Sequence, residues 1–176
     1  ETWPASDIPV SQKVAEQIAA IKENISVRRF ARYEAPEAST IGTYIHGGGK
    51  IGVMVEITGP KSATSEEVAK DVAMHIAAAE PRFLRREDVT EKDLETEREI
   101  ARDAALKSGK PENIVEKMVS GKMEKFYATI VLLDQPYVKE PEKSIKEILT
   151  EAIAKTGENI QVRRFVRYQL GESLED

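Results

Sequence analysis

An eleven-residue segment occurs twice in this chain, and it restricts the possible folds more than any other feature of the sequence. Residues 23–33 read Glu-Asn-Ile-Ser-Val-Arg-Arg-Phe-Ala-Arg-Tyr, and residues 158–168 repeat nine of these eleven positions. Isoleucine and valine alternate with polar residues in both copies, a pattern typical of a β-strand. The copies start 135 residues apart, far beyond the period of a solenoid repeat. We therefore expect two strands in equivalent positions of one sheet, or one such strand in each of two duplicated units.

Two more alternating runs flank three consecutive glycines, Gly47-Gly48-Gly49. Apolar residues at every second position on both sides of a glycine turn predict a β-hairpin with one buried face. Together with the repeated segments, the hairpin predicts an antiparallel sheet of about four strands, at 23–33, 40–46, 50–58 and 158–170. The residues expected on its apolar face are Ile41, Ile45, Ile51, Val53, Val55, Ile57, Ile160 and Val162.

Helical spacing fills most of the remaining chain, so the predicted fold class is α+β, with helices covering one face of the sheet. Three helices are expected at 11–22, with Ser11 as N-cap, at 64–80, capped by Thr64 or Ser65, and at 143–155. For the domains, we expect a linker and entering helix over residues 1–22 and one core domain over residues 23–172.

Residues 91–127 predict an antiparallel helical hairpin that projects from the sheet domain. Its helices are expected at 91–107 and 112–127, and Gly109 and Pro111 lie in the short turn between them. Small apolar residues along the first helix permit close packing within the pair or against a second subunit. A homodimer formed through this hairpin is therefore one possible assembly.

Composition narrows the classes of function. The chain has 176 residues, a formal net charge of −5 and no cysteine. An acidic protein lacks the basic face that nucleic-acid binding needs, so no direct nucleic-acid partner is expected. The absence of cysteine excludes disulfides and thiolate metal sites. No apolar run approaches the length of a membrane helix, so no membrane partner is expected.

Motifs for catalysis are missing, so we expect no enzyme, no catalytic residue, no cofactor and no metal site. Residues 47–52 match Gly-x-Gly-x-x-Gly, but a predicted strand follows where dinucleotide binding needs a helix. His46 and His75 are the only histidines, and two ligands without a third make a weak metal site. His75 follows Asp71 by one helical turn, so we expect a histidine beside the core that is hydrogen-bonded to Asp71.

Both copies of the repeat place arginine, phenylalanine and arginine at alternate positions: 28, 30 and 32, and again 163, 165 and 167. Basic residues between aromatic ones can stack on and clamp RNA, so an RNA- or ribosome-associated module is an alternative. The acidic total charge favours the other interpretation, in which acidic residues of covering helices pair with these arginines.

Several short motifs recur in the order known from one family. They are Glu23-Asn24-Ile25 with Val27-Arg28-Arg29, Tyr44-x-His46 with Ile51-Gly52-Val53, Ala73-Met74-His75-Ile76-Ala77-Ala78 before Pro81, Gly109-Lys110-Pro111, Glu116-Lys117-Met118, Lys125-Phe126, and Gln135-Pro136-Tyr137-Val138-Lys139. This ordered set, from about residue 20 to the end, resembles the elongation factor Ts family, the guanine-nucleotide exchange partners of elongation factor Tu.

Two motifs of that family are absent from the chain. One is the small N-terminal three-helix domain with its Gly-Met-Met-type motif, and the other is the Thr-Asp-Phe-Val wedge. Residues 56–60, rather than the wedge, follow the hairpin. We therefore expect the second half of a long-type core, cut from a larger protein.

The resemblance implies promotion of GDP release from elongation factor Tu, with this chain supplying the docking contact. We expect the partner-binding residues at the hairpin tip and on the next helix: Tyr44, His46, Gly47, Lys50 and Lys70. Because Tyr44 and His46 alternate with Ile45, we expect them to point away from the apolar face. A dimerisation scaffold is a further alternative. The implied location is the bacterial cytoplasm, or the mitochondrial or plastid matrix.

Overall fold

The computed structural model describes residues 7–173, and the chain divides into two compact units, residues 1–32 and residues 33–176. Residues 1–6 of the predicted linker lie outside the described residues. In the first unit, helix α1 (Val10–Ile21) is present as predicted, but Pro9 is its N-cap and no side chain caps it. Ser11 is not the N-cap, because Val10 is already helical and Ser11 therefore lies inside the first turn.

The strand predicted at 23–33 is wrong for the described chain. Residues 24–36 form neither helix nor strand. Alternation determines which side chains share a face, but a strand also needs a free sheet edge for its N–H and C=O groups. Within the described residues, the central strand pairs with the other strand of the hairpin on one side and with the second copy of the repeat on the other, and residues 24–33 pair with neither outer strand.

Three antiparallel strands form the main sheet in the order β1–β2–β5. They are β1 (Ser39–His46), β2 (Ile51–Thr58) and β5 (Gln161–Gln169). A bulge interrupts the β2–β5 register between Glu56 and Ile57. The α+β class and the antiparallel sheet are confirmed, with three strands in place of the four expected.

The hairpin faces differ from the prediction. Four residues separate β1 from β2, so Tyr44 lies opposite Val53 and Ile45 opposite Gly52. Tyr44 therefore shares the buried face with Val53, and Ile45, on the opposite face, is 73% exposed. The prediction was wrong for Ile41 and Ile45 because an even-numbered turn places odd residues of β1 beside even residues of β2. The other residues predicted for the apolar face all belong to the core or pack against it: Ile51, Val53, Val55, Ile57, Ile160 and Val162.

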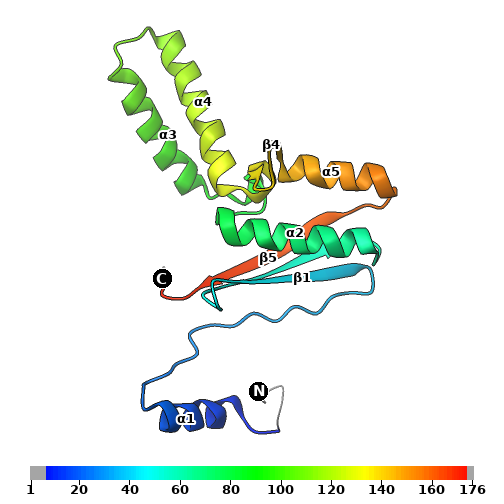
Figure 1. Ribbon diagram of the computed structural model, residues 1–176. Coiled ribbons are helices and arrows are strands. Elements are labelled where there is room, and N and C mark those ends of the chain that lie inside the picture. Colours follow the sequence, from blue (N-terminus) through cyan, green and yellow to red (C-terminus); the bar gives the residue numbers. More distant parts are fainter. Residues whose placement is uncertain (1–6, 174–176) are drawn as a thin grey trace. The chain divides into compact units, whose positions relative to one another are not determined.

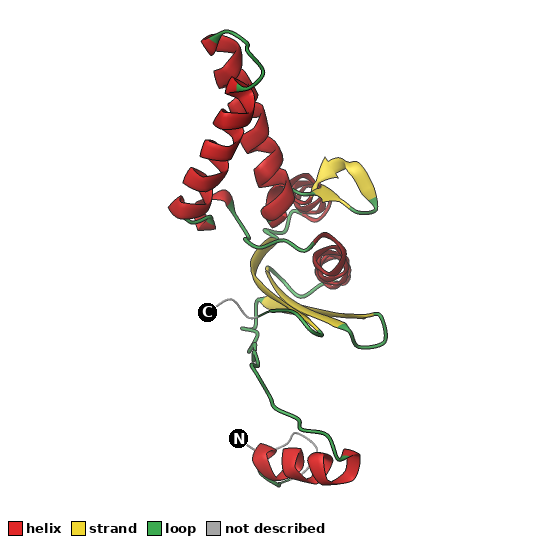
Figure 2. Cartoon of the chain, turned by 90° about the vertical axis from the view of Figure 1, so that its left-hand side faces the viewer, coloured by secondary structure: helices red, strands yellow, loops and turns green. Residues whose placement is uncertain are grey.

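Helices α2 (Ala63–Ala79) and α5 (Ile145–Thr156) cover one side of this sheet (Figures 1 and 2). A capping box begins α2: the hydroxyl of Ser62 accepts from the N–H of Ser65, and that of Ser65 accepts from the N–H of Ser62. Ser62, rather than Thr64 or Ser65, is thus the N-cap. A small two-stranded sheet, β3 (Pro136–Tyr137) with β4 (Glu140–Ser144), precedes α5.

The predicted helical hairpin is present and extends away from the sheet (Figure 1). It consists of α3 (Glu91–Leu106) and α4 (Glu112–Ile130), and Gly109 has a φ of 67° in the turn between them. The short helices η1 (Arg86–Asp88) and η2 (Leu132–Asp134) lie at its base. Its own buried cluster is made by Ala101, Ala105, Val115, Val119 and Met123. Among residues 7–173, no helix is both long and apolar enough to cross a membrane.

Candidate partner-binding site

The tip of the β1–β2 hairpin is a narrow turn held by its own backbone. The carbonyl of His46 accepts hydrogen bonds from the N–H groups of Gly49 and Lys50, at 3.2 and 3.1 Å. Gly47, Gly48 and Gly49 all have positive φ angles, between 60° and 93°. Residues with a Cβ rarely adopt this conformation, so the glycines are what allows the turn to remain this tight.

Tyr44 and His46 form a pair at the end of β1. The Tyr44 hydroxyl and His46 Nδ1 are 3.2 Å apart, and the two rings stack with their centroids 6.0 Å apart. Both side chains point to the same side because they are two residues apart on a strand. Tyr44 also packs against the main core, so the pair is anchored at one end and exposed at the other.

This pair borders a hollow of about 470 Å³. One apolar side chain of β2 and three of α2 line it, together with the turn between β3 and β4. The lining residues are Tyr44, His46, Ile51, Met74, Ala77, Ala78, Glu80, Val138 and Lys139. Val138 is 42% exposed although it is apolar. An apolar floor with a few polar groups at its rim is the usual composition of a contact site for another molecule.

The five predicted site residues are only partly brought together. Tyr44 and His46 line the hollow, and Gly47 and Lys50 lie in the adjoining turn. Lys70 is exposed on α2 and is not among the residues lining the hollow. The expectation that Tyr44 and His46 point away from the buried face was wrong. The cause is the same even-numbered turn that places Ile45 on the exposed face.

Two residues that line the hollow were missed from the sequence. Val138 and Lys139 are distant from the hairpin in the chain, and the packing of the β3–β4 turn against α2 brings them to the same hollow as Tyr44. Met74, which is half-buried on α2, was missed because helical spacing alone does not show which residues beside the core stripe line a hollow. The Gln135–Lys139 motif was the one available signal.

His75 is fully buried and does not bond to Asp71 as predicted. Its Nε2 lies 3.0 Å from Oε1 of Gln135, and its Nδ1 lies 3.3 Å from the backbone nitrogen of Val138. Burial lowers the pKa of His75, and the hydrogen bond with Gln135 opposes that effect only in part. Asp71 instead accepts from the Tyr137 hydroxyl and from Lys139 Nζ, at 2.8 and 2.7 Å.

The arginines of β5 are paired with carboxylates. Glu56 is completely buried and accepts from Arg163 and Arg164, at 2.9 and 2.6 Å. Arg167 pairs with Glu80 at the end of α2. The interpretation that acidic residues pair with these arginines therefore applies to β5. The carboxylate that binds Arg163 and Arg164 comes from strand β2, however, and not from a covering helix. These pairs occupy the groups that an RNA contact would use.

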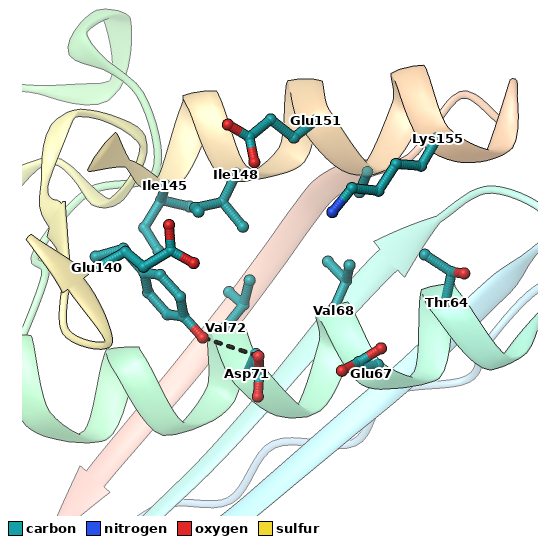
Figure 3. Close-up of a pocket in the computed structure, with 12 residues that line it drawn as sticks. Thr64, Glu67, Val68, Asp71, Val72, Glu140, Ile145, Ile148, Glu151 and Lys155 are labelled. Carbon is teal, nitrogen blue, oxygen red and sulfur yellow. Dashed lines mark hydrogen bonds between the residues drawn. The ribbon is translucent and has the colours of Figure 1, made fainter. Parts of the chain in front are cut away.

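A second hollow, of about 290 Å³, lies between α2 and α5 (Figure 3). Its floor is apolar, with Val68 and Val72 from α2 and Ile145 and Ile148 from α5. Its rim carries Glu67, Asp71, Glu140, Glu151 and Lys155. None of the predicted site residues lines it. Within residues 7–173 there is no group of three or more histidine, aspartate or glutamate side chains placed to hold a metal ion.

The fold and the hairpin hollow define an α+β domain that presents a slim aromatic tip beside an apolar recess. Comparison with known proteins gives the family. The family model for "Elongation factor TS" matches residues 2–172, and the chain therefore belongs to the elongation factor Ts family.

Two curated relatives illustrate the similarity. Elongation factor Ts of Carboxydothermus hydrogenoformans is 53% identical over 139 residues, which cover 76% of this chain and 64% of that protein. Elongation factor Ts of Clostridium perfringens is 48% identical over 170 residues, which cover 96% of this chain and 56% of that protein. The chain thus spans less than two thirds of the length of either relative.

Proposed function

We propose that this chain docks on elongation factor Tu as part of a guanine-nucleotide exchange factor. Membership of the elongation factor Ts family supports the choice of partner. The observation that carries the proposed contact is the hollow beside the hairpin tip, which is lined by the Tyr44–His46 pair and by exposed apolar Val138. Tyrosine and histidine combine apolar area with a polar end, which suits a contact that must form and release.

The proposed activity is binding, without bond making or breaking, so the chain is not an enzyme in this proposal. An exchange factor binds the nucleotide-free GTPase more tightly than the nucleotide-bound form. By thermodynamic reciprocity, the factor lowers the affinity of the GTPase for the nucleotide as much as the nucleotide lowers the affinity of the GTPase for the factor. The chain contains no Thr-Asp-Phe-Val sequence. In this proposal the chain therefore supplies docking, and coupling to the nucleotide lies elsewhere in the factor.

Replacing His46 with alanine tests the proposal. We expect binding to nucleotide-free elongation factor Tu to weaken by about 1–2 kcal/mol, a common value for an interface residue. The melting temperature should barely change, since His46 is exposed at the hairpin tip. Isothermal titration calorimetry measures the affinity.

Ile45→Ala is the matched control, because Ile45 is the neighbouring residue but lies 73% exposed on the opposite face of the hairpin. It should leave the affinity unchanged. Equal affinities for His46→Ala and wild type would remove the hollow from the contact. Failure of the wild-type chain to bind elongation factor Tu at all would refute the proposed function.

A further inference from the structure

The orientation of one buried amide determines the state of His75. Nε2 of Gln135 donates to the carbonyls of Ala79 and Thr129, at 3.0 and 2.7 Å. Only a nitrogen can donate to two carbonyls, so the amide cannot be flipped. Oε1 of Gln135 therefore faces His75 and must accept a hydrogen bond from it.

The tautomer of His75 follows from this contact. Nε2 of His75 lies 3.0 Å from Oε1 of Gln135 and carries the proton. In a neutral ring Nδ1 then has a free lone pair, and it accepts the N–H of Val138 at 3.3 Å. His75 is fully buried, so it links a glutamine fixed by the helix ends to a backbone group of the β3–β4 turn.

Val138 and Lys139 are part of the lining of the hairpin hollow. Asp71, one helical turn before His75 on α2, binds the residues on either side of Val138. It accepts from the Tyr137 hydroxyl, the dashed bond in Figure 3, and from Lys139 Nζ. The side-chain bonds from α2 thus hold three consecutive residues, Tyr137 at the end of β3 and Val138 and Lys139 in the turn, and the bond from His75 is the one made to the backbone of Val138.

We propose that His75 is a positioning residue for partner binding: by accepting the Val138 N–H at Nδ1 it holds the exposed Val138 side chain in the wall of the hollow. This inference rests on the proposed function for its readout in affinity. A buried histidine that does not contact the partner would thus help to determine the shape of the contact site.

Two substitutions of His75 test its two hydrogen bonds one at a time. His75→Asn places an amide oxygen close to the position of Nδ1 and can keep the Val138 bond, but it leaves Gln135 without its donor. His75→Gln places an amide nitrogen close to the position of Nε2 and can keep the Gln135 bond, but it leaves Val138 without its acceptor. Each removes the ring and leaves one buried group unpaired, so both should lower stability to a similar extent.

Hydrogen exchange of the Val138 amide and titration with nucleotide-free elongation factor Tu measure the difference. We expect faster Val138 exchange in His75→Gln than in His75→Asn, and an affinity about fivefold lower, the scale of one hydrogen bond's net contribution. Equal affinities in the two variants, whether reduced together or unchanged, would overturn the positioning role.

Nitrogen NMR of the wild-type chain provides a test that needs no variant to fold. His75 should show a protonated Nε2 and an unprotonated Nδ1, and a protonated Nδ1 would overturn the inference. If wild type fails to bind elongation factor Tu, the proposed function fails. Val138 exchange in the two variants then still decides whether His75 fixes the turn.

Discussion

At the scale of single residues, Glu56 combines full burial with two ion pairs. It is completely buried on the central strand, while its partners Arg163 and Arg164 remain about half exposed. The β-bulge opposite Glu56 brings two consecutive arginines to the same carboxylate. Burial by itself raises the pKa of Glu56, but the hydrogen bonds and charges of Arg164 and Arg163 outweigh it, so that the pKa is lowered.

Replacing Glu56 with glutamine should lower the free energy of unfolding by about 2 kcal/mol, the scale of a hydrogen bond to a charged group. Glutamine keeps the volume of glutamate, but it has no charge and offers a donor where an arginine also donates. Urea denaturation at neutral pH measures the loss. An unchanged unfolding midpoint would show that the two arginines do not stabilise the fold.

The ion pairs of Glu56 with Arg163 and Arg164 also predict that the stability of the fold depends on pH. Because the pKa of Glu56 is lower in the folded state, its contribution is fully present above the unfolded value of about 4.3 and is lost as the pH falls through the folded value. The stability difference between wild type and Glu56→Gln should therefore shrink below about pH 4.3. Denaturation series at several pH values would contradict this if the difference stayed constant or grew in acid.

At the scale of elements, the contact of β1 with α2 depends on one glycine. A Cβ placed on Gly42 would overlap the backbone carbonyl of Ala69 on α2. Ala69 is itself fully buried. The strand and the helix therefore approach more closely than any residue other than glycine at position 42 would allow. This approach also positions Tyr44, two residues further along β1, beside the hollow.

Gly42→Ala should destabilise the protein by about 1–3 kcal/mol, the usual cost of overpacking a core. Gly52→Ala is the matched control on β2, because no atom lies within 4 Å of the added Cβ. Thermal melts followed by circular dichroism compare them. Equal melting temperatures for the two variants would mean that β1 and α2 can separate without cost.

The helical hairpin has a hydrophobic core of its own, apart from that of the sheet. Met123→Ala should lower stability by at least about 2 kcal/mol, as for other large-to-small core changes, since Met123 is buried between α3 and α4. Ile100→Ala, at a 58% exposed position on α3, should change little. Hydrogen exchange should show faster opening of α3 and α4 in Met123→Ala alone. Faster exchange in the sheet as well would mean that the hairpin and sheet open together.

At the scale of the whole molecule, the three clusters of buried apolar side chains found among residues 7–173 are all built from the unit that begins at Tyr33. Helix α1 contributes no buried residue. Tyr33, the first residue of the second unit, lies against Arg164 with the guanidinium 4.0 Å from its ring centroid. The unit that begins at Tyr33 thus contains every buried apolar cluster found among the described residues.

Removing residues 1–32 should leave a chain that still unfolds in one cooperative transition, with its melting temperature within a few degrees of the original. The reason is that burial of apolar area supplies most of the folding free energy. A chain beginning at residue 40 is the comparison, because it also loses Tyr33 and the fully buried Ser39, and it should melt lower. Loss of the cooperative transition in the chain from residue 33 would contradict this prediction.

The sequence by itself determined the elements whose signals are local. Alternation around Gly47–Gly49 identified the hairpin, and Gly109 and Pro111 identified the break between α3 and α4. The family, and with it Tyr44 and His46 as candidate contacts, could also be inferred from ordered motifs. These predictions hold because turn conformation and side-chain periodicity depend on residues close in the chain.

Only the tertiary structure decided which faces and edges are used. The register across a four-residue turn moved Ile45 out of the core and Tyr44 into it. The second copy of the repeat, not the first, pairs with β2, although the two sequences are nearly identical. Val138, which lines the hollow, contacts the buried His75 through packing between segments over 60 residues apart. Each of these outcomes depends on which partner occupies a given face or edge, and local sequence pattern carries no information about that choice.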